Sequence, residues 1–556
     1  MSVKIVLFFT FIVLQINQGF SETVTLQISD GDIVGQVGTT VRQNITYYSF
    51  RGIPYAEPPV GDLRFASPVK NSPWNGTLNA TYDRSECPQY SSDDLLGTTL
   101  YGAEDCLYIN VYTPDVNENF PSVVWIYGGA FMTGNSSFAS FGPDYFLEQG
   151  IVFVSFNYRL GILGFLSTED EACPGNWGIK DQVLALQWVQ ENIAYFGGDP
   201  GNVTIFGESA GAVSVSLLMQ TNMTEGLFHR AIMNSGTTLN LWGLNTRAAA
   251  TATLVSTNMG IITTNKTTMI NELRKVDVEK VMNVGSNTAW TLFLTNGLRG
   301  LPYAPTIEPN IEGALYTNPS DAALSAGLFH KVPVLMGFNS EEAVSAGSVP
   351  HYIDIYLNYY GLIVGFLTPY SLTSDEIKRF ICGQDIKLNF FGDGTLGNRE
   401  NLIKFVSADQ FNRPIRRAAG DMANYTDVYF YEFGYQGNVS VQGEEREFDG
   451  TGHAEDVYYL FNIQNSTNYT NTDLYVSETM VLLWSNFIKY GKPTPFEDER
   501  LNNTIWEPVK SDSDDFTYLS INQSVTLAAN PKESDWQYYQ NAWRKYYDGT
   551  AEDTTY

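Results

Sequence analysis

The sequence predicts an α/β fold with a large, mostly parallel central sheet flanked by helices. Two short, nearly continuous apolar runs, which begin at Ser122 and Ile151, have the composition of strands covered on both faces. Between Asp181 and Ile193, apolar residues recur at the spacing of one helical stripe. A third strand, VTIFG from Val203, is followed directly by a helix of small residues. Strands that alternate with helices are typical of a mostly parallel sheet.

The regions around this core follow simpler patterns. Residues 24–41 alternate between apolar and polar residues around an Asp-Gly turn, which predicts an N-terminal β region with a hairpin. The runs VPVLMGF from Val332 and VYFYEF from Val428 predict further strands. From about Ser345 to Asp427 the chain is rich in Tyr, Phe and Ser with helical stretches, which indicates helical cap insertions packed on the sheet. No repeat, heptad run or long linker divides the chain.

The composition of the 556 residues excludes disorder and several classes of partner. Aromatic residues make up 14% and charged residues only 17%, whereas disordered chains have few aromatics and many charges. The 61 acidic and 32 basic residues give a net charge of −29, and such a surface repels phosphate groups, which are bound by Lys and Arg. Nucleic acid and anionic membranes are therefore not expected as partners. With four His, four Cys and no Cys-x-x-Cys, neither a metal nor a cofactor is predicted.

Residues 1–21 have the organisation of a signal peptide. Lys4 supplies the positive charge, residues 5–14 the apolar core, and residues 19–21 (Gly-Phe-Ser) the small-x-small cleavage site. The apolar core is shorter than the roughly 20 residues that span a bilayer, and no other stretch predicts a membrane span. We expect cleavage after Ser21 and a mature protein that is secreted or lies in the lumen of a secretory vesicle.

Cysteines and sequons fit that compartment. Cys87 and Cys106 flank one short polar loop and are the natural disulfide pair, whereas the sequence does not decide whether Cys173 and Cys382 pair. The mature chain also has about a dozen Asn-x-Ser/Thr sequons, which predicts glycosylated surface loops. The candidate sites include Asn44, Asn75, Asn79, Asn265, Asn438 and Asn465.

One motif carries the chemistry. The strand from Val203 leads into G-E-S-A-G at residues 207–211, and a helix follows at once. A Ser on such a sharp turn has a strained backbone, and flanking glycines avoid steric clash. An isolated G-x-S-x-G is weak evidence in a chain with 48 glycines. The strand–turn–helix context nevertheless predicts that Ser209 is a nucleophile, with a helix N-terminus directed at the reacting centre.

An enzyme that transfers acyl groups also needs hydrogen-bond donors for the oxyanion. Residues 127–131 (YGGAF) follow the strand from Ser122, where a loop must bring backbone N–H groups near Ser209. Small residues allow that close approach, although an ordinary Gly-rich turn would read the same. The N–H of Ala210, directly after the nucleophile, is predicted to be a further donor.

The general base must be one of four histidines. His229 follows the nucleophile too soon, His330 precedes a strand, and His351 has no partner motif. His453 follows the last strong strand, where the chain order Ser…Asp/Glu…His of α/β-hydrolases places the base. The acid must lie between Ser209 and His453, and residues 337–342 (GFNSEE) offer Glu341 and Glu342. Spacing alone does not choose between these two.

Several long motifs in this order resemble the type-B carboxylesterase/lipase family, the cholinesterase-like α/β-hydrolases, over nearly the whole mature chain. They are FRGIPYA at 50–56 with PPVG at 58–61, EDCLYIN at 104–110, NYRLG at 157–161, GGDP at 197–200 and FGESAG at 206–211. The resemblance implies that residues 22–556 form one α/β-hydrolase domain. It also implies Glu342 as the acid, His453 as the base, and Gly129 and Ala130 as the first oxyanion donors. The Cys in the family's EDCLYIN-type motif, here Cys106, is normally disulfide-bonded.

Two departures from the family pattern bear on function. The oxyanion motif usually ends in Gly, where this chain has Ala130, which still supplies an N–H. The loop between Cys87 and Cys106 contains no Trp, whereas cholinesterases place a Trp there to bind quaternary ammonium by cation–π attraction. We therefore do not expect selectivity for choline esters.

The leading hypothesis is a secreted serine carboxylic-ester hydrolase that acts on small-molecule esters through a Ser-His-Glu triad and an acyl-enzyme. The alternative is an esterase-fold adhesion or storage/crystal protein with little or no catalytic role. Adhesion-type relatives typically lose a triad member, and this chain keeps all three. Esterase-like vesicle or crystal proteins of social amoebae also resemble this family, and a sequon-dense, Asn- and Thr-rich chain is similar to them. Oligomeric state is not predicted by the sequence.

Overall fold

The computed structural model describes residues 22–90, 99–296, 300–344, 364–369, 372–392, 396, 398–439, 447–463, 469–510 and 515–549. The predicted N-terminal leader, His351 and Asn465 lie outside these residues. The strands are β1 Thr23–Ile28, β2 Gly31–Thr39, β3 Thr46–Pro54, β4 Thr77–Asn79, β5 Gln89–Tyr90, β6 Leu100–Tyr101, β7 Tyr108–Thr113, β8 Phe120–Ile126, β9 Val152–Phe156, β10 Gly198–Glu208, β11 Arg230–Asn234, β12 Val334–Asn339, β13 Val428–Phe433, β14 Thr517–Ile521 and β15 Val525–Ala529. The helices are α1 Asp144–Leu147, α2 Gly161–Phe165, α3 Trp177–Asn192, α4 Ala210–Gln220, α5 Ala248–Asn258, α6 Lys266–Leu273, α7 Val278–Asn296, α8 Ser320–Ser325, α11 Glu376–Phe391, α12 Arg399–Ser407, α13 Arg413–Ala423, α14 Asn471–Tyr490 and α15 Glu533–Tyr546.

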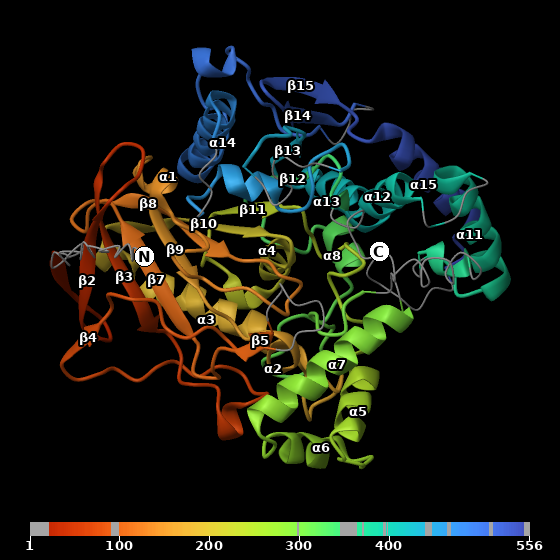
Figure 1. The fold of residues 1–556 in the computed structure, drawn as a ribbon, viewed down its shortest axis with the longest axis horizontal. Coiled ribbons are helices and arrows are strands. Elements are labelled where there is room, and N and C mark those ends of the chain that lie inside the picture. Colours follow the sequence, from red (N-terminus) through yellow and green to blue (C-terminus); the bar gives the residue numbers. More distant parts are fainter. Residues whose placement is uncertain are drawn as a thin grey trace, which may run out of the picture.

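One large sheet runs through the molecule in the order β1-β2-β3-β7-β9-β8-β10-β11-β12-β13-β14-β15 (Figure 1). Every pair from β9 to β14 is parallel, and the pairs at both ends are antiparallel. The predicted α/β-hydrolase fold with a mostly parallel sheet is therefore confirmed. Strand β8 shows why its sequence is nearly all apolar, because Val123, Val124 and Trp125 are fully buried.

The sequence missed part of this sheet. Strand β11, RAIMN, lies between β10 and β12. It was not predicted, because its short run of apolar residues has no clear strand pattern.

Helix α3 begins at Trp177, several residues before the predicted stripe, because its first turn is buried on all sides rather than on one face. Buried turns of this kind show no amphipathic period.

Helices α11, α12, α13 and α15 gather at one side of the molecule, beyond the sheet (Figure 1). Helices α11 and α12 fall in the stretch predicted as a cap, and they have a small apolar core of their own that includes Ile386 and Phe405. The C-terminal helix α15 contributes Ala542 and Tyr546 to the same core. The cap is thus completed by a helix distant in sequence, which the sequence did not predict.

A buried ion pair fixes the segment after β9 to helix α3. The guanidinium of Arg159 donates to both carboxylate oxygens of Asp181 at 2.8 and 2.6 Å and to the carbonyl of Ala66 at 2.8 Å. Both side chains are almost fully buried, with exposed fractions of 3% and 0%. Removal of one partner from such a pair leaves an uncompensated buried charge.

We therefore expect Arg159→Ala to lower the free energy of unfolding by about 3–5 kcal/mol. The matched control is Arg417→Ala, which breaks the more exposed ion pair with Asp421 on α13 and should cost about 0.5 kcal/mol. Urea unfolding followed by fluorescence measures both. Equal losses in the free energy of unfolding for the two substitutions would show that the buried pair contributes no more to stability than the exposed pair.

Candidate active site

The candidate nucleophile Ser209 lies on the turn between β10 and α4. Its φ of +58° is in the left-handed region, so the backbone is strained as predicted for this turn. The turn is held because the N–H of Ser209 donates to the carbonyl of Asn234 on β11 at 2.9 Å. A side chain at Gly211 would collide with the carbonyl of Ile126, and one at Gly207 with the backbone of Gly211. The two flanking glycines are therefore required by close backbone packing.

The structure brings Ser209, His453 and one of the two candidate acids together. The Ser209 hydroxyl lies 2.7 Å from His453 Nε2, and Nδ1 of the same ring lies 2.7 Å from Glu342 Oε2. These three side chains come from the ends of β10 and β12 and from the loop after β13. Their geometry is that of a nucleophile, a base and an orienting carboxylate.

The two neighbouring glutamates have different surroundings. Glu342 is buried, and its Oε1 accepts hydrogen bonds from Ser235 Oγ at 2.5 Å and from the Asn339 N–H at 2.7 Å. Glu341 points elsewhere and pairs with Lys532 at 3.1 Å. Of these two glutamates, Glu342 is therefore the one that contacts the His453 ring.

A third carboxylate, Glu208, lies beside this group. Its Oε1 is 3.3 Å from His453 Nε2, and the side chain is buried. Burial raises the pKa of Glu208 to about 8, against the charge of His453. For His453 burial lowers the pKa, but the charge of Glu208 and the hydrogen bond to Glu342 outweigh burial and raise the pKa to about 9. Both groups therefore hold protons to a higher pH than usual.

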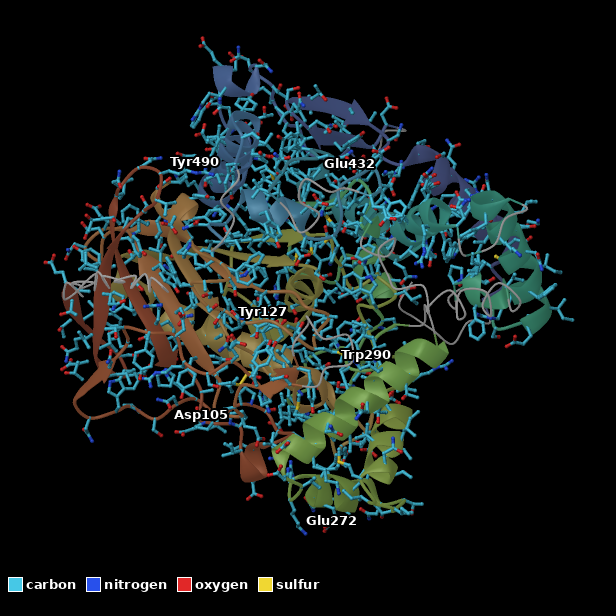
Figure 2. All side chains as sticks on the ribbon, in the orientation of Figure 1. Asp105, Tyr127, Glu272, Trp290, Glu432 and Tyr490 are labelled. Carbon is cyan, nitrogen blue, oxygen red and sulfur yellow. A yellow bond between two sulfur atoms is a disulfide. The ribbon has the colours of Figure 1, made fainter. Side chains whose placement is uncertain are left out.

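The loop after β8 is shaped to present backbone N–H groups. Gly129, Ala130 and Phe131 have φ values of +107°, +55° and +58°. Among the described residues, no acceptor is found for the N–H groups of Gly129, Ala130 and Ala210. A side chain at Gly128 would lie 2.8 Å from Ser209 Cβ, so the loop can approach the nucleophile only with glycine there. At the start of the loop Tyr127 lies in the interior (Figure 2). Its ring stacks on that of Tyr158.

Aromatic rings form a wall next to His453. The ring of Phe411 lies 4.9 Å from the His453 ring and 5.4 Å from that of Trp242, which is itself 6.5 Å from His453. Neither Phe411 nor Trp242 was predicted from the sequence to lie at the site, and Phe411 is distant in sequence from every motif. An apolar group of a substrate can pack on this wall.

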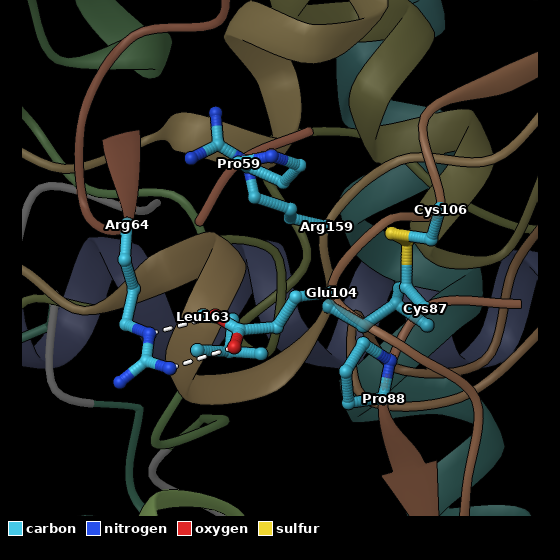
Figure 3. A pocket seen from close by; sticks show the side chains of 9 residues that line it. Pro59, Arg64, Cys87, Pro88, Glu104, Cys106, Arg159 and Leu163 are labelled. Carbon is cyan, nitrogen blue, oxygen red and sulfur yellow. Dashed lines mark hydrogen bonds and ion pairs between the residues drawn. A yellow bond between two sulfur atoms is a disulfide. The ribbon is translucent and has the colours of Figure 1, made fainter. Parts of the chain in front are cut away.

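The pocket in Figure 3 is a structural feature beside the Cys87–Cys106 disulfide. Arg64 lines it and donates to both carboxylate oxygens of Glu104, at 2.7 and 2.6 Å, and to the carbonyl of Val276. Arg159 also lines it and is bound to Asp181. Because the charged groups already bind one another, they stabilise the fold rather than a ligand.

The remaining residues named from the sequence lie elsewhere. Cys173 and Cys382 are both buried and unpaired with each other. His229 accepts from the Val203 N–H, and His330 contacts Thr221 and Thr224. Four candidate glycosylation sites are exposed, namely Asn44, Asn75, Asn79 and Asn265, and Asn438 is half-buried. In the described part of the chain there is no cluster of metal-binding side chains and no helix able to span a membrane.

The family model of the carboxylesterase family matches residues 22–539. The chain belongs to the carboxylesterase family. It is 35% identical to Esterase FE4 of Myzus persicae over 92% of both chains, and 32% identical to the juvenile hormone esterase of Tribolium castaneum over 86% of this chain and 85% of the relative. The crystal structure of juvenile hormone esterase from Manduca sexta, with OTFP covalently attached, superimposes with a TM-score of 0.84 at 28% identity, covering 94% of this chain and 100% of that one. The protein is thus a carboxylic ester hydrolase.

Residues that support the esterase's candidate triad were missed by sequence reasoning. Ser235 and Asn339 both donate to Glu342, and Asp456 accepts hydrogen bonds from Asn234 at 2.9 Å and Tyr431 at 2.7 Å. The sequence could have indicated Ser235 and Asn339, since polar residues at the ends of buried parallel strands meet at one edge of a sheet. The rest depend on contacts between distant segments.

Proposed function

We propose that the esterase hydrolyses carboxylic esters through Ser209, His453 and Glu342 and a covalent acyl-enzyme. His453 Nε2 removes the proton of the Ser209 hydroxyl as its oxygen attacks the ester carbonyl carbon. Glu342 holds the Nδ1–H tautomer and stabilises the imidazolium that forms. The protonated His453 then delivers its proton to the leaving alcohol, and the acyl group remains on Ser209 Oγ. Water, deprotonated by the same histidine, releases the acid.

The negative charge of the tetrahedral intermediate needs donors close to the nucleophile. We assign this role to the N–H groups of Gly129, Ala130 and Ala210, which have no acceptor among the described residues. One such donor is worth about 3 kcal/mol in the transition state. Ala130 supplies its N–H as glycine would, because only the backbone takes part.

The observation that carries the proposal is the pair of 2.7 Å hydrogen bonds on either side of the His453 ring. A storage or adhesion protein has no need for a serine and a carboxylate aligned on one imidazole. The covalent adduct in the juvenile hormone esterase structure further supports covalent chemistry for this fold.

The test is intact-mass analysis of the purified mature protein after treatment with a fluorophosphonate. One adduct is expected, located at Ser209, together with hydrolysis of p-nitrophenyl acetate. A folded protein that gains no adduct and hydrolyses no ester would contradict the proposal and favour the adhesion or storage hypothesis.

The compartment is part of the proposal. We infer that residues 1–21 are removed as a signal peptide and that the mature single domain from residue 22 is secreted or held in a vesicle lumen. The Cys87–Cys106 disulfide, with sulfurs 2.08 Å apart, and the exposed sequons support an oxidising secretory environment. Mass analysis of the secreted protein before and after glycosidase treatment reports both the cleavage site and the glycans.

The raised pKa values predict an alkaline pH profile. Only neutral His453 can accept the proton of Ser209, so kcat/KM should rise with pH, with a midpoint above the ordinary 6.5 of histidine. As pH rises, Glu208 ionises and its charge keeps the proton on His453. Glu208→Gln removes that charge, which destabilises the imidazolium, lowers the pKa of His453 and moves the rising limb to lower pH.

The control for this profile is Glu432→Gln, which removes a half-buried carboxylate that lies 3.8 Å from the Lys532 ammonium group rather than beside His453. Its profile should coincide with that of the wild type. A Glu208→Gln profile that stays in place or moves to higher pH would contradict the assignment.

A further inference from the structure

The helix that carries Phe411 is interrupted. Helices α12 and α13 are joined through a π-helical turn, Ala408–Asn412, rather than by continuous α-helix. We call these five residues the π-turn. Such turns are rare and occur frequently at functional sites. This one has contacts on two sides, one toward the candidate active site and one toward the C-terminal helix.

The inner side of the π-turn is fastened to the aromatic wall. The carbonyl of Gln410 accepts hydrogen bonds from Asn240 Nδ2 at 2.8 Å and from Trp242 Nε1 at 3.1 Å. The next residue, Phe411, contacts the ring of His453. The position of the π-turn therefore fixes both rings of the wall at once.

Ser407, the residue directly before the π-turn, connects this segment to the loop that carries Glu342. Ser407 Oγ accepts a hydrogen bond from the N–H of Ala343 at 3.0 Å, and Ala343 directly follows Glu342. The segment thus contacts the acid loop, the wall and the histidine.

The outer side of the π-turn is fastened by a buried ion pair. Asp409 Oδ1 lies 3.0 Å from Arg413 Nη2, and Asp409 Oδ2 accepts a hydrogen bond from Gln410 Nε2 at 2.6 Å. Both charged side chains are buried, with exposed fractions of 4% for Asp409 and 7% for Arg413. Asp409 therefore links the Arg413 guanidinium to the residue whose carbonyl binds Trp242.

Helix α15 clamps Arg413 from outside. The guanidinium lies 4.5 Å from the ring of Tyr539 and 4.9 Å from that of Trp543. Arg416, one turn further along α13, donates to Glu533 at 2.7 Å and to the carbonyl of Pro531 at 2.7 Å. Two guanidinium groups thus join the C-terminal helix to the helix that follows the π-turn.

We propose that Asp409 and Arg413, held by Tyr539 and Trp543 of α15, are positioning residues that set the wall formed by Phe411 and Trp242 and so determine which apolar ester groups the enzyme accepts. None of the four touches the reacting atoms. A planar guanidinium packed against two rings has little freedom, and a carboxylate that binds two donors is held in one orientation. The C-terminal helix thereby acts on the substrate site through the π-turn. This proposal rests on the proposed ester hydrolysis.

The experiment compares Asp409→Asn with Asp421→Asn. Both substitutions remove the carboxylate of an i, i+4 ion pair with arginine, but the Asp421–Arg417 pair lies on the outside of α13. Asparagine at position 409 has one acceptor oxygen for two donors, so the link to Arg413 or to Gln410 must open. The readouts are kcat/KM for p-nitrophenyl acetate, butyrate and octanoate, and the rate of labelling by a small fluorophosphonate.

We expect Asp409→Asn to lower the octanoate-to-acetate ratio of kcat/KM by about tenfold, because one methylene in a fitted pocket already changes selectivity by that order. The labelling rate should stay within about twofold of the wild type, since the small probe needs only the triad. Asp421→Asn should change neither quantity. Equal losses on all three esters, or an unchanged ratio, would overturn the proposal.

A second variant keeps the test sound if Asp409→Asn unfolds. Tyr539→Leu removes one ring that packs on Arg413 but leaves both charged groups of the Asp409–Arg413 ion pair in place. Its octanoate-to-acetate ratio should fall in the same direction while its labelling rate is retained. An unchanged ratio in a folded Tyr539→Leu would overturn the role of α15. A wild type that neither labels nor hydrolyses acetate would instead overturn the proposed function, and this inference with it.

Discussion

Replacement of Ser209 with Ala should lower kcat for a simple ester by about 10⁴-fold or more, because the members of a catalytic triad act as a unit. Alanine cannot form the acyl-enzyme. The remaining rate comes from the N–H groups of the oxyanion loop and from substrate binding, neither of which the substitution removes. The effect should therefore fall on kcat, with little change in KM.

The fold should survive this substitution. The backbone of residue 209 is held by the hydrogen bond from its N–H to Asn234, which alanine retains. Steady-state kinetics and intact-mass analysis after fluorophosphonate treatment measure the result, and circular dichroism verifies folding. A folded Ser209→Ala protein that still gains an adduct, or that keeps a tenth of the wild-type kcat, would place the nucleophile elsewhere.

The centre of this fold could be predicted because its signals are local. Strand β10, the turn at Ser209 and helix α4 are consecutive in sequence, and the glycines that the turn requires are two residues from the serine. The apolar runs of β8 and β9 are nearly continuous because both faces of the sheet are covered. Each of these features follows from the residues within one short window.

The choice between Glu341 and Glu342 shows where local reasoning ends. The two residues are adjacent and chemically identical, so their difference lies in what the rest of the chain brings to them. Ser235 and His453 surround one, and Lys532 the other. Those partners are separated from the pair by about 100 residues or more, and only resemblance to a known family could choose before the structure.

The packing of the cap could not be predicted either, because it also depends on contacts between distant segments. Helix α15 completes the apolar core of α11 and α12 and clamps Arg413, yet nothing in its own sequence indicates which helix it meets. The π-turn was likewise not predicted from the sequence, since Gln410 and Phe411 within it and Ser407 just before it contact three segments that are distant in sequence. Tertiary contacts between distant segments override local propensity at these positions.

Replacement of Glu342 with Gln should lower kcat by about 10⁴-fold while leaving the site nearly unchanged in shape. The backbone N–H of Asn339 cannot turn away, so the glutamine oxygen must face it and the amide NH₂ must face His453. Nδ1 then has to accept a hydrogen bond, which moves the ring proton to Nε2. In that tautomer the imidazole donates to Ser209 and can no longer remove its proton.

The neighbouring substitution, Glu341→Gln, is the matched control. Its carboxylate binds Lys532 on the far side of the loop, and a partly exposed ion pair contributes little, so kcat should stay within about threefold of the wild type. Both variants are assayed with the same ester at a pH above the midpoint of the wild-type profile, and their labelling rates by a fluorophosphonate should follow the same order. If Glu341→Gln proved the more damaging of the two, the orienting acid would be Glu341, and the two hydrogen bonds that Glu342 accepts from Ser235 and Asn339 would serve only to hold the loop after β12.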